Sequence, residues 1–283
     1  MTLTPNFFIA GTPKSGTTSL FHYLQEHPEV FLPELKEPHF FSCPEVKNTY
    51  YKTKIVDSKQ EYLDLYQERE SYKAVGDLSS SYLFNKETPK RIHQFNPYAK
   101  IIIVLRNPVE RALSHYLMDV NLGYINVPLL EVINNKDTFK QHYQEYIELG
   151  FYEQQIRAYT KQFPDSQIKV VLSDTLYANT AETLKDIYSF INVSTTFITD
   201  FETVHNSYTV PRFKALKSLV QSDGLKKMIP SGLKSGLKSL IYKTNAEKPK
   251  LEVEKNLLRE IYKKSIVETE TLINQDLSSW KLT

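Results

Sequence analysis

Four short, largely apolar runs are separated by longer stretches in which apolar residues recur at helical spacing. The runs are 7–10, 74–78, 100–105 and 168–172. Apolar runs of this length are typical of parallel strands that are buried on both faces. Because helix-like segments lie between the runs, the pattern predicts an α/β fold of three layers, in which helices flank a central parallel sheet.

The predicted helices carry recognisable start and end signals. Helical spacing is found over 87–95, 152–163, 180–191 and 251–277. Asn107 and Pro108 predict a helix start after the third run, and Thr180 is available to cap a helix after the fourth. Trp280 is expected to dock the end of the last helix. No internal repeat or low-complexity tract divides the sequence, so we expect one domain over 1–283.

The first run ends in a turn rich in Gly, Pro and Ser that opens directly into a helix-like pattern, from Gly11 to Leu20. A strand, a loop and a helix N-terminus present unpaired backbone N–H groups and a positive dipole end to an anion. This arrangement predicts a P-loop-like site for a phosphate or a sulfate ester. The ATP-binding pattern G-x-x-x-x-G-K-[ST] is not met, because Thr17 follows Gly16 and Lys14 lies between the glycines.

The hexapeptide P-K-S-G-T-T at 13–18 resembles the 5′-phosphosulfate-binding loop of sulfotransferases. These enzymes use 3′-phosphoadenosine 5′-phosphosulfate (PAPS) and release the product PAP. A turn with a solvated lysine is the alternative interpretation. The resemblance implies that no metal is required, and it implies a set of nucleotide-binding residues. They are Pro13, Lys14, Ser15, Gly16, Thr17, Thr18 and Ser19.

A second segment tests this interpretation independently. Arg106 follows the run 100–105, and Ser114 lies about two turns along the next helix. An arginine at the carboxyl end of a parallel strand faces the crevice where such sheets bind ligands. The pattern R-[DN]-P-x-x-R-x-x-S resembles the 3′-phosphate motif of sulfotransferases, which uses the Arg and the Ser. Two anion sites on neighbouring strand ends suit a nucleotide with phosphates at both ends, which PAPS is and ATP is not.

Sulfuryl transfer also needs a group that neutralises the leaving phosphate and a base near the acceptor hydroxyl. Lys14 is the candidate for the first role, together with backbone donors of its loop. The segment E-x-H-F-F at 37–41 resembles a segment of heparan-sulfate-type sulfotransferases in which the glutamate is the proposed base, and Glu37 matches that position. His39 is the competing base, because imidazole titrates near neutral pH.

The segment G-D-L-S-S-S-Y resembles a family region beside the substrate, which makes Asp77, Tyr82 and Glu37 candidate substrate-binding residues. Glycosaminoglycan sulfotransferases commonly have a lysine where Leu78 stands, and this weakens a glycosaminoglycan assignment. Two roles stay open for Asp77: orienting the acceptor or Lys14, and capping a turn. The resemblance to the carbohydrate-type branch implies a hydroxyl acceptor on a carbohydrate or glycolipid. A lipid, polyketide or other small-molecule hydroxyl is the alternative.

The last third of the sequence adds two weaker signals. The segment from His205 to Arg212 resembles the loop that closes over the nucleotide in bacterial members, so Tyr208 and Arg212 become candidate nucleotide contacts. In Lys214–Lys243, leucines alternate with lysines and are interrupted by Gly and Pro. We interpret this segment either as a lid over the nucleotide cleft or as a weak contact with an anionic membrane surface.

Composition narrows the function class. The net charge of +2 is too balanced for a nucleic-acid-binding protein. With one cysteine, Cys43, and no stretch of membrane-spanning length, a cytoplasmic protein is expected. Two other classes stay open. A nucleotide kinase or ATPase would need magnesium ligands and a lysine after Gly16, and a non-catalytic PAP-binding protein would need no base.

Overall fold

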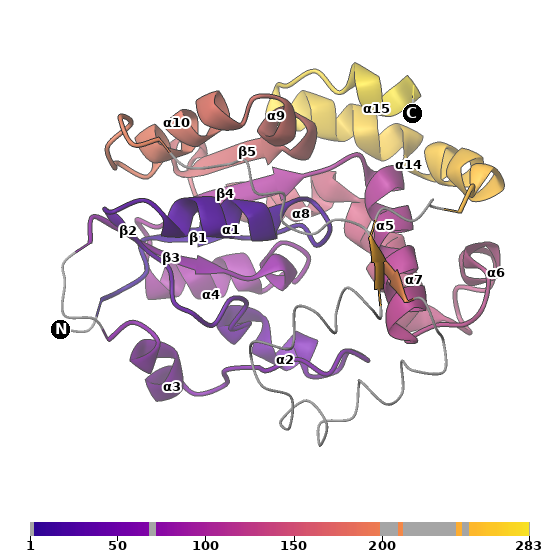
Figure 1. The fold of residues 1–283 in the computed structure, drawn as a ribbon, viewed down its shortest axis with the longest axis horizontal. Coiled ribbons are helices and arrows are strands. Elements are labelled where there is room, and N and C mark those ends of the chain that lie inside the picture. The colour runs from indigo at the N-terminus through magenta and orange to yellow at the C-terminus, as the bar shows by residue number, and fades with distance from the viewer. Residues whose placement is uncertain (1–2, 68–71, 199–208, 212–241, 245–248, 283) are drawn as a thin grey trace.

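A central sheet of five parallel strands organises the described part of the chain (Figure 1). The computed structural model describes residues 3–67, 72–198, 209–211, 242–244 and 249–282. The strands are β1 (Phe7–Ile9), β2 (Val30–Phe31), β3 (Ala74–Leu78), β4 (Lys100–Leu105) and β5 (Ile168–Leu172). They pair in the order β2-β3-β1-β4-β5, and every pair is parallel. The predicted parallel sheet is confirmed; β2 was missed because two residues leave no pattern.

Helices connect the strands and cover the sheet. They are α1 (Thr17–Gln25), α2 (Cys43–Val46), α3 (Lys59–Asp64), α4 (Thr88–Phe95), α5 (Pro108–Leu122), α6 (Leu129–Asn134), α7 (Lys140–Tyr146), α8 (Tyr152–Thr160), α9 (Ser173–Ala178), α10 (Thr180–Phe190), α14 (Glu252–Ile273) and α15 (Ser278–Leu282). The helices predicted from spacing correspond to α4, α8, α10 and α14. The sequence pattern did not predict α6 and α7, which are short and lie beside the site.

One predicted helix cap is confirmed and one is wrong. The side-chain oxygen of Asn107 accepts a hydrogen bond from the Val109 N–H at 2.9 Å and caps α5. Thr180 does not cap α10, because Asn179 is the residue that precedes the helix. The Thr180 hydroxyl donates instead to the carbonyl of Leu176 at 2.8 Å. Since α9 ends immediately before α10, its last turn supplies this nearer acceptor.

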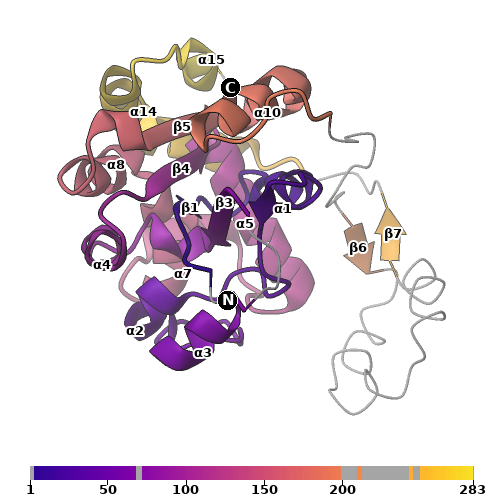
Figure 2. The ribbon, with the colours of Figure 1, turned by 90° about the vertical axis from the view of Figure 1, so that its left-hand side faces the viewer.

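Side chains alternate across the sheet and form two apolar cores. In β4, Ile101 and Ile103 pack on the side covered by α4, α5, α8 and α14. Ile102 and Val104 pack on the side covered by α1, α9 and α10. Figure 2 shows α4 and α8 on one side of the sheet and α1 and α10 on the other. The predicted arrangement of three layers is therefore present.

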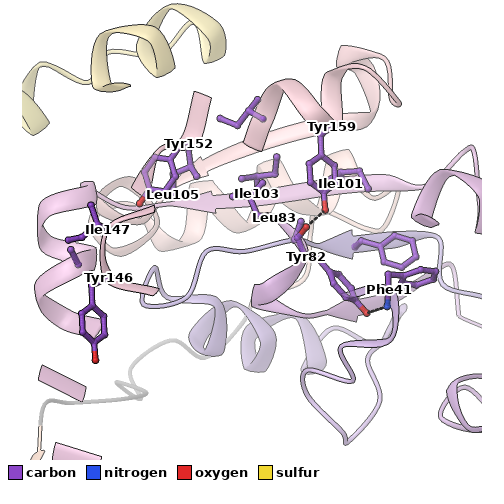
Figure 3. Packing of buried hydrophobic residues seen from close by; sticks show 14 of the residues in the cluster. Phe41, Tyr82, Leu83, Ile101, Ile103, Leu105, Tyr146, Ile147, Tyr152 and Tyr159 are labelled. Carbon is purple, nitrogen blue, oxygen red and sulfur yellow. Dashed lines mark hydrogen bonds between the residues drawn. The ribbon is translucent and has the colours of Figure 1, made fainter. Parts of the chain in front are cut away.

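The larger core contains buried tyrosines whose hydroxyls are hydrogen-bonded (Figure 3). On α8, Tyr159 donates to the carbonyl of Tyr82 at 2.9 Å, and Tyr152 donates to the carbonyl of Arg106 at 2.8 Å. These bonds tie α8 to the segments that follow β3 and β4, and they satisfy polar groups that would be costly to bury alone. Trp280, in α15, is 2% exposed and packs in the same core, as the sequence predicted.

Two further strands, β6 (Thr209–Pro211) and β7 (Tyr242–Thr244), pair with each other in antiparallel register. The predicted nucleotide contacts Tyr208 and Arg212 lie outside the described residues, and so does all of Lys214–Lys243 except its last two residues. Over the described ranges, no helix combines the length and the apolar composition that crossing a membrane requires.

Gly76, in β3, has no room for a side chain. A Cβ atom there would lie 2.2 Å from Cζ of Phe7 and 2.7 Å from Cδ2 of Leu32. We predict that Gly76→Ala lowers the free energy of unfolding by about 1–3 kcal/mol, because an overpacked core must shift side chains and backbone. Urea unfolding measures the change, and the exposed Ser189→Ala serves as a control within about 0.5 kcal/mol of the parent. Unchanged stability of Gly76→Ala would contradict the close packing.

Candidate active site

A cavity of about 1170 Å³ opens at the carboxyl ends of β1, β3 and β4. The segments that follow these three strands all contribute to its wall, as do α5 and α7. Ligands of open parallel sheets bind at this edge, in the crevice beyond the strand ends. The sheet thus brings to one cavity segments that are far apart in the sequence.

The loop after β1 forms one end of the cavity. The residues of this loop and of the first turn of α1 that line it are Pro13, Lys14, Gly16, Thr17 and Thr18. Gly16 has a φ of 93°, in the left-handed region that favours glycine, and α1 begins after it without a side-chain cap. The first N–H groups of a helix have no acceptor inside the helix. This end of the cavity is therefore suited to an anion.

Two of the predicted loop residues do not present their side chains to this cavity. Ser15 and Ser19 are both buried, and neither belongs to the cavity wall in the described structure. The Ser15 hydroxyl lies 2.5 Å from the hydroxyl of Thr12. Any contribution of Ser15 and Ser19 to ligand binding in this conformation comes from the backbone.

Arg106, at the end of β4, reaches the same loop. Its guanidinium donates to the carbonyl of Lys14 at 3.1 Å and lies 3.9 Å from the carboxylate of Glu110. Ser114, on α5, lines the cavity with Arg106. The Lys14 Nζ lies 3.3 Å from the sulfur of Met118 on the same helix. The two anion-binding motifs of the sequence therefore meet in one cavity.

Glu37 and His39 occupy a loop on another wall of the cavity. The Glu37 carboxylate pairs with Lys36, accepts the Ser80 hydroxyl at 2.7 Å, and lies 3.8 Å from Nε2 of His39. His39 Nδ1 is 2.8 Å from the Ser81 hydroxyl. Both candidate bases therefore face the same cavity, and their side chains lie close to each other.

The surroundings set the charge of these two groups. Burial raises the pKa of Glu37, but the charge of Lys36 and hydrogen bonds from Lys36 and Ser80 outweigh it and hold the pKa below its usual value. Burial lowers the pKa of His39 by more than the neighbouring Glu37 charge raises it. At neutral pH Glu37 is an anion and His39 a neutral imidazole, so each can accept a proton.

The structure does not bring Asp77 and Tyr82 to the cavity. Both are fully buried, and the Asp77 carboxylate accepts the hydroxyls of Tyr62 and Tyr82, each at 2.8 Å. Its other oxygen lies 3.4 Å from the hydroxyl of Ser79, which accepts the backbone N–H of His39 at 3.1 Å. The expectation that Asp77 and Tyr82 contact the acceptor does not fit this geometry. They instead stabilise the loop that contains Glu37 and His39, which we call the base loop.

A further wall consists of residues that the motifs did not include. His115 Nε2 lies 2.7 Å from the hydroxyl of Tyr51 and 4.0 Å from the carboxylate of Glu145, and all three line the cavity. Burial raises the pKa of Glu145 to about 7. His115 directly follows Ser114, the last residue of the second motif, so its position next to the motif was the available signal. Tyr51 and Glu145 come from segments without a recognisable pattern.

Residues 4–264 match the family model described as the sulfotransferase domain. The chain belongs to the sulfotransferase family. Its fold agrees: a solved sulfotransferase from Alicyclobacillus acidocaldarius has a TM-score of 0.75 and 28% identity, and the match covers 99% of each chain. The mouse sulfotransferase SULT7A1, solved with PAP, shares the fold with a TM-score of 0.52 and 14% identity over 94% of this chain and 85% of that one.

Curated relatives are similar over part of their length. Heparan sulfate glucosamine 3-O-sulfotransferase 6 of Homo sapiens is 26% identical over 192 residues, which are 67% of this chain and 52% of the relative. Membrane-associated sulfotransferase kil1 of Dictyostelium discoideum is 38% identical over 112 residues, which are 40% of this chain and 22% of the relative. The chain thus spans about half, or less, of the curated relatives it matches.

The buried Asp77 gives a testable pH dependence. Its burial raises the pKa to about 7, whereas an unfolded aspartate titrates near pH 4. Between these values the folded state holds a proton that the unfolded state has lost, so the Asp77 contribution to stability falls as pH rises through this window. We predict that Asp77→Asn gains on the order of 2–3 kcal/mol relative to the parent between about pH 4.5 and about pH 7.5.

Urea unfolding of both proteins at the two pH values measures this gain. Because the two chains share all other titrating groups, the difference between them isolates Asp77. A difference that does not change with pH would show that Asp77 titrates normally in the folded protein.

Proposed function

We propose that this chain is a PAPS-dependent sulfotransferase that transfers a sulfuryl group to a hydroxyl of a carbohydrate or glycolipid and releases PAP. The observation that carries the proposal is the meeting of Lys14, Arg106 and Ser114 in one cavity with Glu37 and His39. Cations at two neighbouring strand ends match a ligand with two anionic groups. A potential base lies in the same cavity. We further propose that 1–283 act as one catalytic domain.

The chain's own groups fit the two ends of PAPS, which supplies the sulfuryl group when it is bound. The uncapped N-terminus of α1 and the Lys14 ammonium suit the 5′ end, where charge develops on the leaving phosphate. Arg106 and Ser114 suit the 3′-phosphate, since a guanidinium can bind two phosphate oxygens at once. Tyr208 and Arg212 are proposed as further nucleotide contacts from the resemblance alone.

Glu37 is the proposed base. It is ionised at neutral pH and is held in place by Lys36 and Ser80, so it can accept the hydroxyl proton while the acceptor oxygen attacks. His39, a neutral imidazole 3.8 Å from the Glu37 carboxylate, is the competing base. Lys14 would offset the charge of the leaving group during the same step.

The part of the cavity wall that lies around Tyr51 and Tyr124, which we call the acceptor end, supports the assignment of a carbohydrate acceptor. Its wall offers two aromatic rings, Tyr51 and Tyr124, and side-chain amides such as Asn121, Gln141 and Gln144. Ring faces and a few polar groups that fix orientation are the usual equipment of a small-ligand site. The similarity to a relative named as a glucosamine 3-O-sulfotransferase points to the same class. Incubation of the chain with PAPS and a panel of sugar, glycolipid, lipid and polyketide hydroxyls, with mass detection of sulfated product, tests this assignment.

The two anion sites can be separated with two nucleotides. PAP carries both phosphates, whereas adenosine 5′-monophosphate lacks the 3′-phosphate. We predict that Lys14→Met weakens binding of both by about tenfold or more, because each loses a charge-assisted hydrogen bond. Arg106→Met should weaken PAP by a similar factor and leave adenosine 5′-monophosphate nearly unchanged. Isothermal titration calorimetry at one fixed salt concentration measures these affinities.

Lys185→Met is the matched control, since Lys185 is exposed on α10 and pairs with Glu182. Its affinity for PAP should equal that of the parent. If Arg106→Met weakened both nucleotides equally, Arg106 would not recognise the 3′-phosphate specifically.

The identity of the base can be tested by paired substitutions. We predict that Glu37→Gln lowers kcat by about 100-fold or more with PAP affinity nearly unchanged, because the amide cannot take the acceptor proton. His39→Asn should lower kcat by less. Sulfated product is measured by mass spectrometry with the acceptor found in the panel, and the exposed Glu34→Gln is the control. Near-normal turnover of Glu37→Gln, with loss in His39→Asn, would move the role to His39.

A further inference from the structure

The wall that contains His115 has a fixed pattern of hydrogen-bond donors. Arg111 is fully buried, and its guanidinium lies 3.1 Å from Nδ1 of His115. Because a guanidinium can only donate, Nδ1 accepts and the ring proton of neutral His115 sits on Nε2. Nε2–H then donates to the Tyr51 hydroxyl, 2.7 Å away, and Tyr51 donates to the Asp119 carboxylate at 2.7 Å. The ring proton of His115 and the hydroxyl proton of Tyr51 are thus both engaged within this chain of groups.

Glu145 stands beside this chain of groups and receives none of those protons. Its carboxylate lines the cavity, although only 9% of the residue is exposed, and it lies 4.0 Å from His115 Nε2, beyond hydrogen-bond distance. Arg111 donates to the backbone carbonyls of Glu145 and Tyr146 rather than to the Glu145 carboxylate. Within the described part of the chain, no side-chain hydrogen bond satisfies this carboxylate. Because the carboxylate reaches the cavity, a bound ligand can supply the hydrogen-bond donor that these side chains do not.

Glu145 lies close to the reacting end of the cavity. His115 follows Ser114 on α5, and both line the cavity together with Lys14. Lys14 itself contacts Met118, about one turn further along α5. The carboxylate of Glu145 therefore faces the region where an acceptor sugar has to sit, rather than a distant part of the cavity.

Building on the function proposed above, we propose that Glu145 binds a hydrogen-bond donor of the acceptor, a hydroxyl or an amino group on the sugar unit that reacts. The ionised form of Glu145 would repel a carboxylate or sulfate on that unit. The cavity then selects an uncharged or cationic sugar over a polyanionic one.

The distribution of the remaining charges agrees with this selection. Lys52 and Lys140 line the acceptor side of the cavity but are exposed at its rim. Exposed cations are screened by salt and contribute little to selectivity. Glu45, the other acidic group on this side, is engaged by Arg91 in two hydrogen bonds of 2.8 and 2.9 Å. Among the described acidic side chains that line the cavity, Glu145 is thus the one that forms no ion pair with a lysine or arginine.

Three tetrasaccharides of similar size separate the possibilities: chitotetraose with free amino groups, its neutral N-acetylated form, and an unsulfated heparosan fragment with carboxylates. Binding to the PAP-saturated chain is followed by NMR titration. We expect the parent to bind the first two and to bind the heparosan fragment at least about tenfold more weakly. Glu145→Gln should weaken the amino form by about tenfold, change the neutral form by less than about threefold, and reduce the discrimination against heparosan.

Two further variants keep the experiment decisive. Glu145→Asp keeps the charge but withdraws the carboxylate by one methylene, so it should weaken the amino form and still reject heparosan. Glu131→Gln, on the exposed face of α6, should bind all three sugars as the parent does. Thermal unfolding of each variant shows that the fold is intact.

Preferred binding of the heparosan fragment by the parent would overturn the role of Glu145, as would unchanged discrimination in Glu145→Gln. Absence of binding by all three sugars while PAP still binds would overturn it as well. Loss of PAP binding by the parent would instead contradict the proposed sulfotransferase function, because Glu145 is not among the nucleotide contacts.

Discussion

The parallel pairing of β1 with β4 is the constraint on which the site depends. The backbone ladder continues past the end of β1, because Val104 donates to the carbonyl of Gly11 at 2.9 Å and accepts from Thr12 at 2.7 Å. The chain after Thr12 and the chain after Val104 must therefore leave the sheet at the same edge. Lys14 and Arg106, 92 positions apart in the sequence, meet for this reason, and the bond from Arg106 to the Lys14 carbonyl fixes their relative position.

A second constraint holds the base loop, whose backbone is unfavourable by itself. Glu37 and His39 have φ values of 64° and 56°, a left-handed conformation that costs a residue with a side chain about 1–2 kcal/mol. Two hydrogen bonds offset this cost: the Glu37 N–H donates to the carbonyl of Leu78, and the His39 N–H donates to the hydroxyl of Ser79. Ser79 in turn is steadied by buried Asp77. Hydrogen bonds thus hold the loop at the carboxyl end of β3, while Arg106 directly follows the carboxyl end of β4 in the chain.

The sequence could predict the parts of the fold and the site that depend on local patterns. The strand 100–105 and the cap at Asn107 could be predicted because apolar runs and capping residues are properties of adjacent positions. The sequence could predict that Lys14, Arg106 and Ser114 meet in one cavity for the same reason, since two compact motifs after strands contain them. Asp77 was misjudged as an acceptor contact, because its motif shows a polar residue at a strand end but not the two tyrosine hydroxyls that bury it.

Glu145 shows what local patterns cannot contain. It lies on α7, a short helix without a strong periodic signal, and Arg111 on α5 holds the end of that helix by donating to the backbone carbonyls of Glu145 and Tyr146. Neither segment has a sequence pattern that predicts this contact, because tertiary packing decides the partners of a buried arginine. Sequence patterns therefore predict the part of the cavity around Lys14 and Arg106 better than the wall around Glu145.

Glu37 and Glu145, two of the three glutamates among the described residues that line the cavity, have different environments, and this difference suits them to different roles. Glu37 is surrounded by donors, Lys36 and Ser80, which favour its charged form, as a base requires. Glu145 receives no side-chain hydrogen bond from the described residues, and burial raises its pKa to about 7, although the charge of Arg111 opposes this rise. In its ionised form this carboxylate can accept a hydrogen bond from an amino group or from a hydroxyl. We therefore propose that one glutamate acts as the base and the other binds the sugar, because the fold supplies hydrogen-bond donors to Glu37 and none from a side chain to Glu145.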